Sequence, residues 1–202
     1  MEMLLNYFVA LPFVIAICQA EITDPDLKKL DWLVGTWVGQ HSGKTRWPTI
    51  PTMTYGEVVV VQEAPVSRSA GIRMLNFSAR SWAHSTKDHL HDEWGYIYVD
   101  PNGNATLMTT GNNGFNKYEE GPVQYGYWTT ELRDIGRISH VRDLPVEMLK
   151  RTFRLTGSGY MEQVLDMRTE THPRSYHGEL ENHRTLEHAR IYYVKQEEEY
   201  KP

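Results

Sequence analysis

The stretch GYIYVDPNGNATLM, residues 95–108, decides the fold of this chain. It contains two β-rich runs, Gly95–Val99 and Ala105–Met108, on either side of a turn that is rich in Pro, Asn and Gly. Glycine in such a turn supplies the positive φ that a tight hairpin requires. The two runs are therefore predicted to be neighbouring antiparallel strands.

Further short runs of the same kind are spread along the rest of the sequence. Turn residues of the same type separate several of them, at residues 111–114 and 156–159. This spacing is typical of a β-sandwich or a β-barrel. The additional runs are Tyr55–Val61, Tyr125–Thr129, Thr152–Leu155, Tyr160–Leu165 and Ile191–Val194.

Helical spacing is found only near the N-terminus. Asp24 and Pro25 have the pattern of a helix start, and Leu27, Leu30 and Leu33 follow at helical spacing. We therefore expect an all-β chain with one short N-terminal helix. No internal repeat, heptad series or low-complexity linker divides it, so residues 21–202 are predicted to form one domain.

Composition limits the classes of function. The chain has 202 residues, of which 40% are hydrophobic, and a formal net charge of −5 at pH 7. This supports one domain with a substantial core. A negative chain offers no cationic surface for phosphates, so nucleic acid is not an expected partner. The sequence also lacks a nucleophile elbow, a phosphate-binding loop and a dinucleotide-binding motif.

Residues 1–20 differ in composition from the rest. The segment from Tyr7 to Cys18 is almost entirely apolar, and Cys18 and Ala20 are small residues at the expected cleavage positions of a secretory signal. The basic residues that usually open such a signal are missing, so an uncleaved anchor or an internal apolar helix remain alternatives. We expect a cleaved signal and a secreted or extracytoplasmic protein without stable membrane insertion; without a signal, the protein would be cytoplasmic.

Two further features bear on export. Asn76 and Asn104 each begin an Asn-x-Ser/Thr acceptor sequence, which is compatible with passage through a secretory pathway. Cys18 is the single cysteine and lies within the predicted signal. The mature chain would then have no thiol, which excludes disulfides, thiolate catalysis and cysteine-bound metals.

Four sequence blocks occur in a fixed order along the chain. They are Leu33–Gly39, which contains Gly-x-Trp-x-Gly; Trp47–Ile50, an aromatic-Pro-Thr step; Leu90–Ile97; and Pro173–His177, a Pro-x-x-x-His element. In this order they resemble the nitrobindin family, which includes the haem-binding C-terminal domain of a THAP-type zinc-finger protein. The resemblance implies a single antiparallel β-barrel of about ten strands that holds haem b.

The resemblance also assigns the site residues. His177 matches the proximal histidine that binds the haem iron, and Thr49 matches a threonine that contacts the haem. Trp37 and Trp47 are candidates for the walls of the haem slot, although tryptophans in β-barrels are more often core residues. His41, in a loop longer than the common form of the family, is a candidate hydrogen-bond donor on the open side of the iron.

The resemblance implies that the haem iron carries out the reaction. A ferric haem with one protein ligand leaves a position for nitric oxide or peroxynitrite, and the expected reaction is isomerisation of peroxynitrite to nitrate. No side chain is predicted to be catalytic beyond the iron. Two alternatives stay open: a secreted barrel without haem that carries a small apolar ligand, and a structural domain whose interior is filled by side chains.

The remaining histidines give weaker signals. His89 and His91 are two residues apart and are expected on one face of a strand, where a metal site is one interpretation and a solvated pair the favoured one. Four histidines near the C-terminus have spacings that match neither a helix face nor a strand face consistently. They are His172, His177, His183 and His188.

Overall fold

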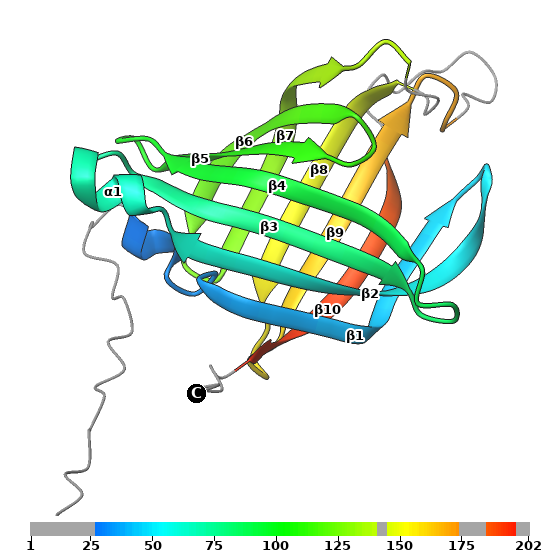
Figure 1. Ribbon diagram of the computed structural model, residues 1–202, viewed down its shortest axis with the longest axis horizontal. Helices are drawn as coiled ribbons and strands as arrows, with labels where there is room; N and C mark the ends of the chain where they lie inside the picture. The colour runs from blue at the N-terminus through cyan, green and yellow to red at the C-terminus, as the bar shows by residue number, and fades with distance from the viewer. Residues whose placement is uncertain (1–26, 141–144, 174–184, 197–202) are drawn as a thin grey trace, which may run out of the picture.

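The computed structural model describes residues 27–140, 145–173 and 185–196. Within these residues ten strands form a closed antiparallel barrel, and each strand pairs with its neighbours in sequence while the last pairs with the first (Figure 1). This confirms the predicted all-β barrel. The strands are β1 (Gly35–Trp47), β2 (Ile50–Glu63), β3 (Met74–Ala83), β4 (His89–Val99), β5 (Asn104–Gly111), β6 (Phe115–Gln124), β7 (Tyr127–Arg137), β8 (Val146–Leu155), β9 (Met161–Thr169) and β10 (Leu186–Gln196).

The predicted hairpin turns have the expected backbone. Gly103, Gly114 and Gly159 all have positive φ, at 88°, 79° and 81°. Asp100 accepts hydrogen bonds from the backbone N–H groups of Asn102 and Asn104, which stabilises the turn that joins β4 and β5. The quoted stretch therefore folds as a hairpin because its turn residues fit the geometry that a short loop needs.

Two short helices accompany the barrel in the part of the chain that the structure describes. The described part of the predicted N-terminal helix is one turn of 3-10 helix, η1 (Leu27–Leu30), and its predicted start at residues 24–25 lies outside the described residues. A second helix, α1 (Pro65–Ala70), was not predicted and joins β2 to β3. No helix within the described residues is both long and apolar enough to cross a membrane.

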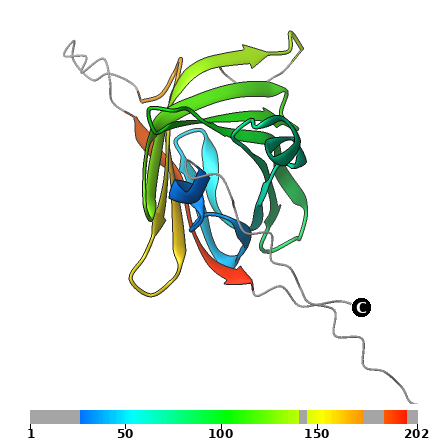
Figure 2. The same ribbon diagram turned by 90° about the vertical axis from the view of Figure 1, so that its left-hand side faces the viewer.

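One end of the barrel interior is filled by large side chains. η1 lies across this end, which faces the viewer in Figure 2, and Leu27, Leu30 and the following Leu33 are fully buried. Further in, the rings of Trp128 and Phe153 stack at 5.7 Å. Other fully buried members of this core are Trp37, Leu75, Phe77, Ile97, Leu107, Met161 and Tyr193. We refer to this half as the closed half.

Next to this core the interior is crossed by buried charged residues, which we call the polar layer: Glu57, Glu93, Lys117, Glu119 and Arg151. The Arg151 guanidinium donates two 3.0 Å hydrogen bonds to Glu119 and also pairs with Glu93 at 3.0 Å. Lys117 forms a second ion pair with Glu93. Because buried charges are costly unless paired, this layer is stable only as a connected set.

Candidate functional site

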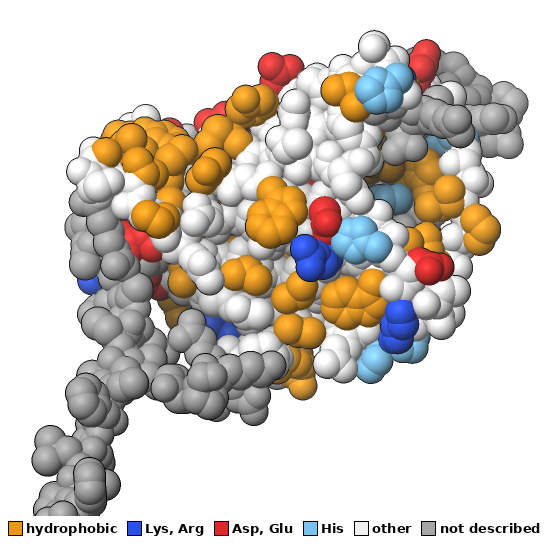
Figure 3. Space-filling view, viewed as in Figure 1, with side chains coloured by type: hydrophobic (Ala, Val, Ile, Leu, Met, Phe, Trp, Pro, Cys, Tyr) orange, Lys and Arg blue, Asp and Glu red, His pale blue; other side chains and the backbone are white. Residues whose placement is uncertain are grey.

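Trp47, the last residue of β1, lies at the centre of an aromatic and histidine cluster at the other end of the barrel. Its ring centroid is 5.4 Å from that of His188 and 6.3 Å from that of His172, both in edge-to-face geometry. Figure 3 shows histidine and hydrophobic side chains together at the right-hand end of the molecule. We refer to this half of the barrel interior as the open half.

The pairing of β1 with β10 brings this cluster together. Thr45 lies opposite Ala189 in the β1–β10 register, and its hydroxyl donates a 3.1 Å hydrogen bond to the backbone carbonyl of His188. The strand register shifts between Glu187 and Ala189, so His188 occupies a β-bulge. Bulges redirect side chains, and this one places the His188 ring against Trp47.

The His188 imidazole has an uncommon environment. Its Nδ1 is buried and has no hydrogen-bond partner among the described residues. Burial lowers the pKa of the ring, a hydrogen bond with the Arg46 backbone acts in the opposite direction, and the nearby His91 lowers the pKa further. The ring is therefore neutral at pH 7 and retains a lone pair that a metal ion can use.

Apolar side chains line the open half without being fully covered. Leu165 lies opposite the buried Arg151 and Met167 lies opposite the buried Leu149, and directly opposed residues in a sheet project to the same face. Leu165 and Met167 thus face the interior, yet both are only partly buried. Leu186 pairs with Met167 and is also partly buried. The described side chains leave apolar surface here that an additional apolar group can cover.

The polar layer borders this apolar surface. Burial alone would raise the pKa of Glu93, but the Arg151 and Lys117 charges beside it hold that pKa well below its usual range. His91 Nε2 lies 3.2 Å from the Glu93 carboxylate. Glu57 accepts a hydrogen bond from the Tyr193 hydroxyl, and burial raises the pKa of its carboxyl. The open half therefore has apolar sides and a charged, hydrogen-bonded boundary.

The predicted pairing of His89 with His91 on one face is wrong. The register between β3 and β4 shifts between Arg80 and Trp82, and the resulting irregularity separates the two histidines. His89 forms a 2.8 Å ion pair with Asp92 and is about half exposed, whereas His91 contacts the buried Glu93. Strict alternation does not hold here because the strand contains one extra residue. An extra residue reverses the face of the sheet to which the following side chains project.

The structure places the residues predicted for the site in different parts of the molecule, and one of them lies outside the described residues. Thr49 is an exposed residue of the two-residue turn between β1 and β2, two positions after Trp47. His177 lies outside the described residues, between Pro173 and residue 185. Trp47 belongs to the open half, as proposed. His41 is exposed and its ring packs edge-on against His84 at 4.6 Å, so its described contact is with the β3–β4 connection.

Trp37 does not line the open half. It is 1% exposed, belongs to the core cluster of the closed half, and donates a 2.8 Å hydrogen bond to the Leu33 carbonyl. The alternative interpretation, that a barrel tryptophan is a core residue, is correct for this position. Sequence reasoning did not single out His188, because its place in a bulge gives it no regular spacing to its neighbours.

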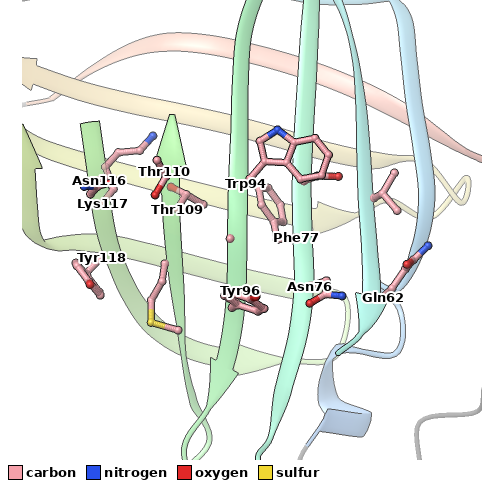
Figure 4. Close-up of a pocket in the computed structure, with 14 residues that line it drawn as sticks. Gln62, Asn76, Phe77, Trp94, Tyr96, Thr109, Thr110, Asn116, Lys117 and Tyr118 are labelled. Atoms are coloured by element: carbon pink, nitrogen blue, oxygen red, sulfur yellow. The ribbon is translucent and has the colours of Figure 1, made fainter. Parts of the chain in front are cut away.

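A separate groove of about 880 Å³ lies over the surface of strands β2 to β6. Its lining includes Trp94, Tyr96 and Tyr118, which are 56%, 46% and 46% exposed, together with Asn76 of the predicted glycosylation acceptor. Figure 4 shows these side chains projecting from neighbouring strands. The groove and the cluster around Trp47 have no residue in common.

The chain matches a known protein family over most of its length. Residues 26–184 match the family described as "THAP4-like, heme-binding beta-barrel domain". The chain belongs to this haem-binding nitrobindin family. The predicted resemblance is therefore confirmed, and the match covers most of the nitrobindin-type barrel.

Individual relatives agree with this family. Human "Peroxynitrite isomerase THAP4" is 32% identical over 155 residues, which cover 76% of this chain and 26% of the relative. An uncharacterised Caenorhabditis elegans protein is 32% identical over 178 residues, covering 84% and 56%. "Peroxynitrite isomerase 2" of Mycobacterium marinum is 31% identical over 137 residues, covering 66% and 79%. The nitrobindin-type chain thus spans about a quarter of the length of the human relative.

A solved structure has the same fold. The crystal structure of Rv2717c from M. tuberculosis superposes with a TM-score of 0.68 at 24% identity, covering 86% of this chain and 99% of the other. At this level of identity the likeness establishes the fold alone. It agrees with the closed ten-stranded barrel described above.

The residues of the open half fit a haem group. A haem needs an apolar slot, a strong axial donor and a polar border. Trp47, Leu165 and Met167 provide aromatic and aliphatic surface, and His188 provides a neutral imidazole with a free nitrogen. The polar layer provides the border. The fit rests on these side chains and on their incomplete burial, independently of the family match.

Proposed function

We propose that this barrel binds haem b and catalyses the isomerisation of peroxynitrite to nitrate, with reversible binding of nitric oxide. The observation that carries the proposal is the open half, which combines partly buried apolar side chains with a neutral imidazole, that of His188, whose buried Nδ1 has no hydrogen-bond partner among the described residues. The family description and the names of the relatives agree with it. Bound haem supplies an iron centre with one coordination position open to a small ligand.

The chain's own residues bind and orient the group. Trp47, Leu165 and Met167 would exclude water from the slot, and a histidine near the C-terminus would bind the iron. The resemblance predicts His177 for that role. Thr49, in the turn directly after the Trp47 strand, is proposed to reach a polar edge of the group with its hydroxyl, as the matching threonine does in the family.

The polar layer gives the proposed slot a border of paired charges. Arg151 and Lys117 lie behind Glu93, and His91 extends from Glu93 with about a third of its side chain exposed. These groups are held in place by mutual ion pairs, so the border is preorganised. The protein would therefore hold the haem in one orientation, restrict the access of water and surround the slot with charges whose positions are fixed.

The first test is an absorption titration of the full chain with haemin. A Soret band that saturates at one haem per chain, followed by faster peroxynitrite decay with nitrate as product, is the expected result. Matched controls are haemin alone and the barrel without haemin. A folded barrel that gives no stoichiometric band contradicts the proposal and favours the alternative, a carrier of a small apolar ligand in the same slot.

We also propose that residues 1–20 are a cleaved export signal and that residues 21–202 form the mature domain. The apolar segment Tyr7–Cys18 and the small residues before position 21 support this proposal. Expression of the full chain in a secreting cell, followed by mass spectrometry of the medium, tests it. A mature N-terminus near residue 21 is expected; a chain retained in the cell with Met1 intact would argue for a cytoplasmic protein.

A further inference from the structure

We infer that Asn76 carries an N-linked glycan and that the first sugars of this glycan lie in the groove over strands β2 to β6. The inference rests on the proposed export of the chain and does not depend on haem binding. Asn76 begins the acceptor sequence Asn76-Phe77-Ser78, which has no part in the proposed haem site. The surroundings of this sequence in the folded barrel suit an attached glycan.

The acceptor asparagine lies on the outer face of the barrel. Phe77 is 2% exposed and belongs to the core, so its neighbours Asn76 and Ser78 project outward. Both are partly buried and line the groove. Transfer of the oligosaccharide accompanies synthesis of the chain, so the finished barrel has to leave room for a bulky group at this position. A groove of about 880 Å³ beside an outward-facing asparagine meets that requirement.

Aromatic rings stand beside the attachment point. In the β3–β4 register Tyr96 lies opposite Asn76 and Trp94 lies opposite Ser78, and directly opposed residues project to the same face of a sheet (Figure 4). Both rings are exposed, Trp94 to 56%. A sugar ring has an apolar face of C–H groups, and such a face packs on an exposed aromatic ring. Without a cover, these rings form an apolar patch on the surface.

The rest of the lining has the polarity that a sugar requires. Gln62 provides an amide on β2, and Thr110 and Asn116 lie opposite each other on β5 and β6. Amide and hydroxyl groups both donate and accept hydrogen bonds, as sugar hydroxyls do. Among the described residues that line the groove, Lys117 is the single charged one, and its amino group is buried in an ion pair with Glu93. The groove therefore fits a neutral oligosaccharide.

Covalent attachment decides which oligosaccharide can occupy the groove. The rings of Trp94 and Tyr96 are exposed rather than enclosed, so their contacts with a free sugar would be weak. A free sugar also loses translational and rotational freedom each time it binds. A sugar bound to Asn76 is held beside these rings at a high effective concentration, so weak contacts are sufficient. The occupant that the groove fits is the chain's own glycan.

The covalent step transfers an oligosaccharide from a lipid diphosphate carrier to Asn76. The amide nitrogen of Asn76 forms a bond to the anomeric carbon of the first sugar, and the amide loses one proton. The bond between that carbon and the diphosphate oxygen breaks, and the lipid diphosphate leaves with its electron pair. Ser78 supplies the hydroxyl that the acceptor sequence requires, and a threonine in its place would meet the same need.

The second acceptor sequence lacks such a surface. Asn104, the first residue of β5, pairs with Pro122 of β6, and its side chain hydrogen bonds to Asp100 in the preceding turn. It is not among the described residues that line the groove. A glycan at Asn104 would therefore extend into solvent, which makes this position a matched comparison within the same chain.

The first experiment measures occupancy. The full chain is expressed in a secreting eukaryotic cell, and its peptides are mapped by mass spectrometry after enzymatic removal of N-linked glycans, which converts an occupied asparagine to aspartate. We expect Asn76 to be occupied in the secreted wild type. Ser78→Thr should keep the glycan and Ser78→Ala should lose it, although both variants leave Asn76 in place.

The second experiment, hydroxyl-radical footprinting of the same proteins, measures whether the glycan covers Trp94. Covering one of the two faces of the indole should slow its oxidation about twofold relative to Ser78→Ala or Asn76→Gln. Asn104→Gln is the matched control and should keep the wild-type rate. Tyr125 is 77% exposed and lies outside the groove, so its oxidation rate is the reference that should not change.

A variant that fails to fold without the glycan does not prevent the comparison. Enzymatic removal of the glycan from the folded wild type then provides the unglycosylated form. An occupied Asn76 whose removal leaves the oxidation rate of Trp94 unchanged would overturn the placement of the sugars in the groove.

The remaining outcomes separate this inference from the proposals on which the protein's function rests. A secreted chain with Asn76 unoccupied would overturn the inference and leave export intact, and dimerisation of that chain through the groove would assign the surface to a second copy. A chain retained in the cytosol would overturn the inference together with the proposed export. Titration with haemin tests the haem-binding function separately in each case.

Discussion

The two halves of the barrel interior are built by the same strands, but they differ in how completely their side chains are buried. In the closed half Trp128, Phe153 and Leu107 are fully buried beneath η1. In the open half Leu165 and Met167 face the interior and remain partly exposed. A well-packed interior stabilises the fold, whereas an underfilled apolar interior has capacity for a ligand. The polar layer separates the two.

The largest expected effect comes from breaking that layer. Arg151→Met removes the partner of both Glu93 and Glu119 and leaves Glu119 as an uncompensated buried charge beside Thr130. We expect the free energy of unfolding to fall by about 3–5 kcal/mol. Urea unfolding measures it. The exposed Arg133, paired with Glu120, provides the control: Arg133→Met should cost less than about 1 kcal/mol.

The second prediction compares the halves directly with one kind of substitution. Leu107→Ala in the closed half creates a cavity among fully buried neighbours and should cost about 3 kcal/mol. Leu165→Ala in the open half removes a side chain that is already partly exposed and should cost about 1 kcal/mol. Equal losses in urea unfolding of the haem-free protein would show that the open half is packed as tightly as the closed one.

The third prediction concerns the backbone where the closed half meets the polar layer. A Cβ on Gly95 would lie 1.7 Å from the backbone carbonyl oxygen of Met108, a contact that no side-chain rotation can relieve. Gly95→Ala should therefore destabilise the fold by about 2 kcal/mol, measured by thermal or urea unfolding. At Gly157 a Cβ meets nothing within 4 Å, so Gly157→Ala should stay within about 0.5 kcal/mol of the wild type.

The smallest effect is expected at Glu57, and it depends on pH. Burial raises the pKa of this carboxyl above its ordinary value of 4.5, so the folded state binds more protons than the unfolded state between the two values. Stability contributed by this group is present below pH 4.5 and is lost as the pH rises through the raised pKa.

Glu57→Gln should remove that decline. In urea unfolding across pH 4–8, the variant should gain stability relative to the wild type as the pH rises, while its amide still accepts the Tyr193 hydrogen bond. Glu131→Gln, the same chemical change at an exposed position of β7, is the matched control. Parallel stability curves for Glu57→Gln and the wild type would contradict a raised pKa of the Glu57 carboxyl.

The sequence allowed the hairpins to be predicted but not every strand. Turn glycines such as Gly103 and Gly159 have a local cause, positive φ, that is visible in sequence. β6 was not recognised, because its inward residues include Lys117 and Glu119, which break the expected apolar alternation. Their partners Glu93 and Arg151 lie on other strands. The inward charges are therefore neutralised by contacts between strands, which the local sequence does not reveal.

The site was harder to predict than the fold for a related reason. Trp47 and Thr49 are recognisable from a local motif, and Trp47 does belong to the open half. His188 depends on a bulge and on pairing with β1, neither of which leaves a pattern in the residues around it. His177 remains a prediction based on a motif, and its place lies outside the described residues.

The pairing of β1 with β10 has a consequence for how the protein is made. Thr45 and His188, which hydrogen bond across this seam, are 143 positions apart in the chain. During synthesis the first hairpin leaves the ribosome long before the strand that completes it, and such distant contacts form slowly. Until β10 arrives, β1 has an unpaired edge that other strands can join. Binding competence and protection from aggregation would therefore be acquired in the same late step.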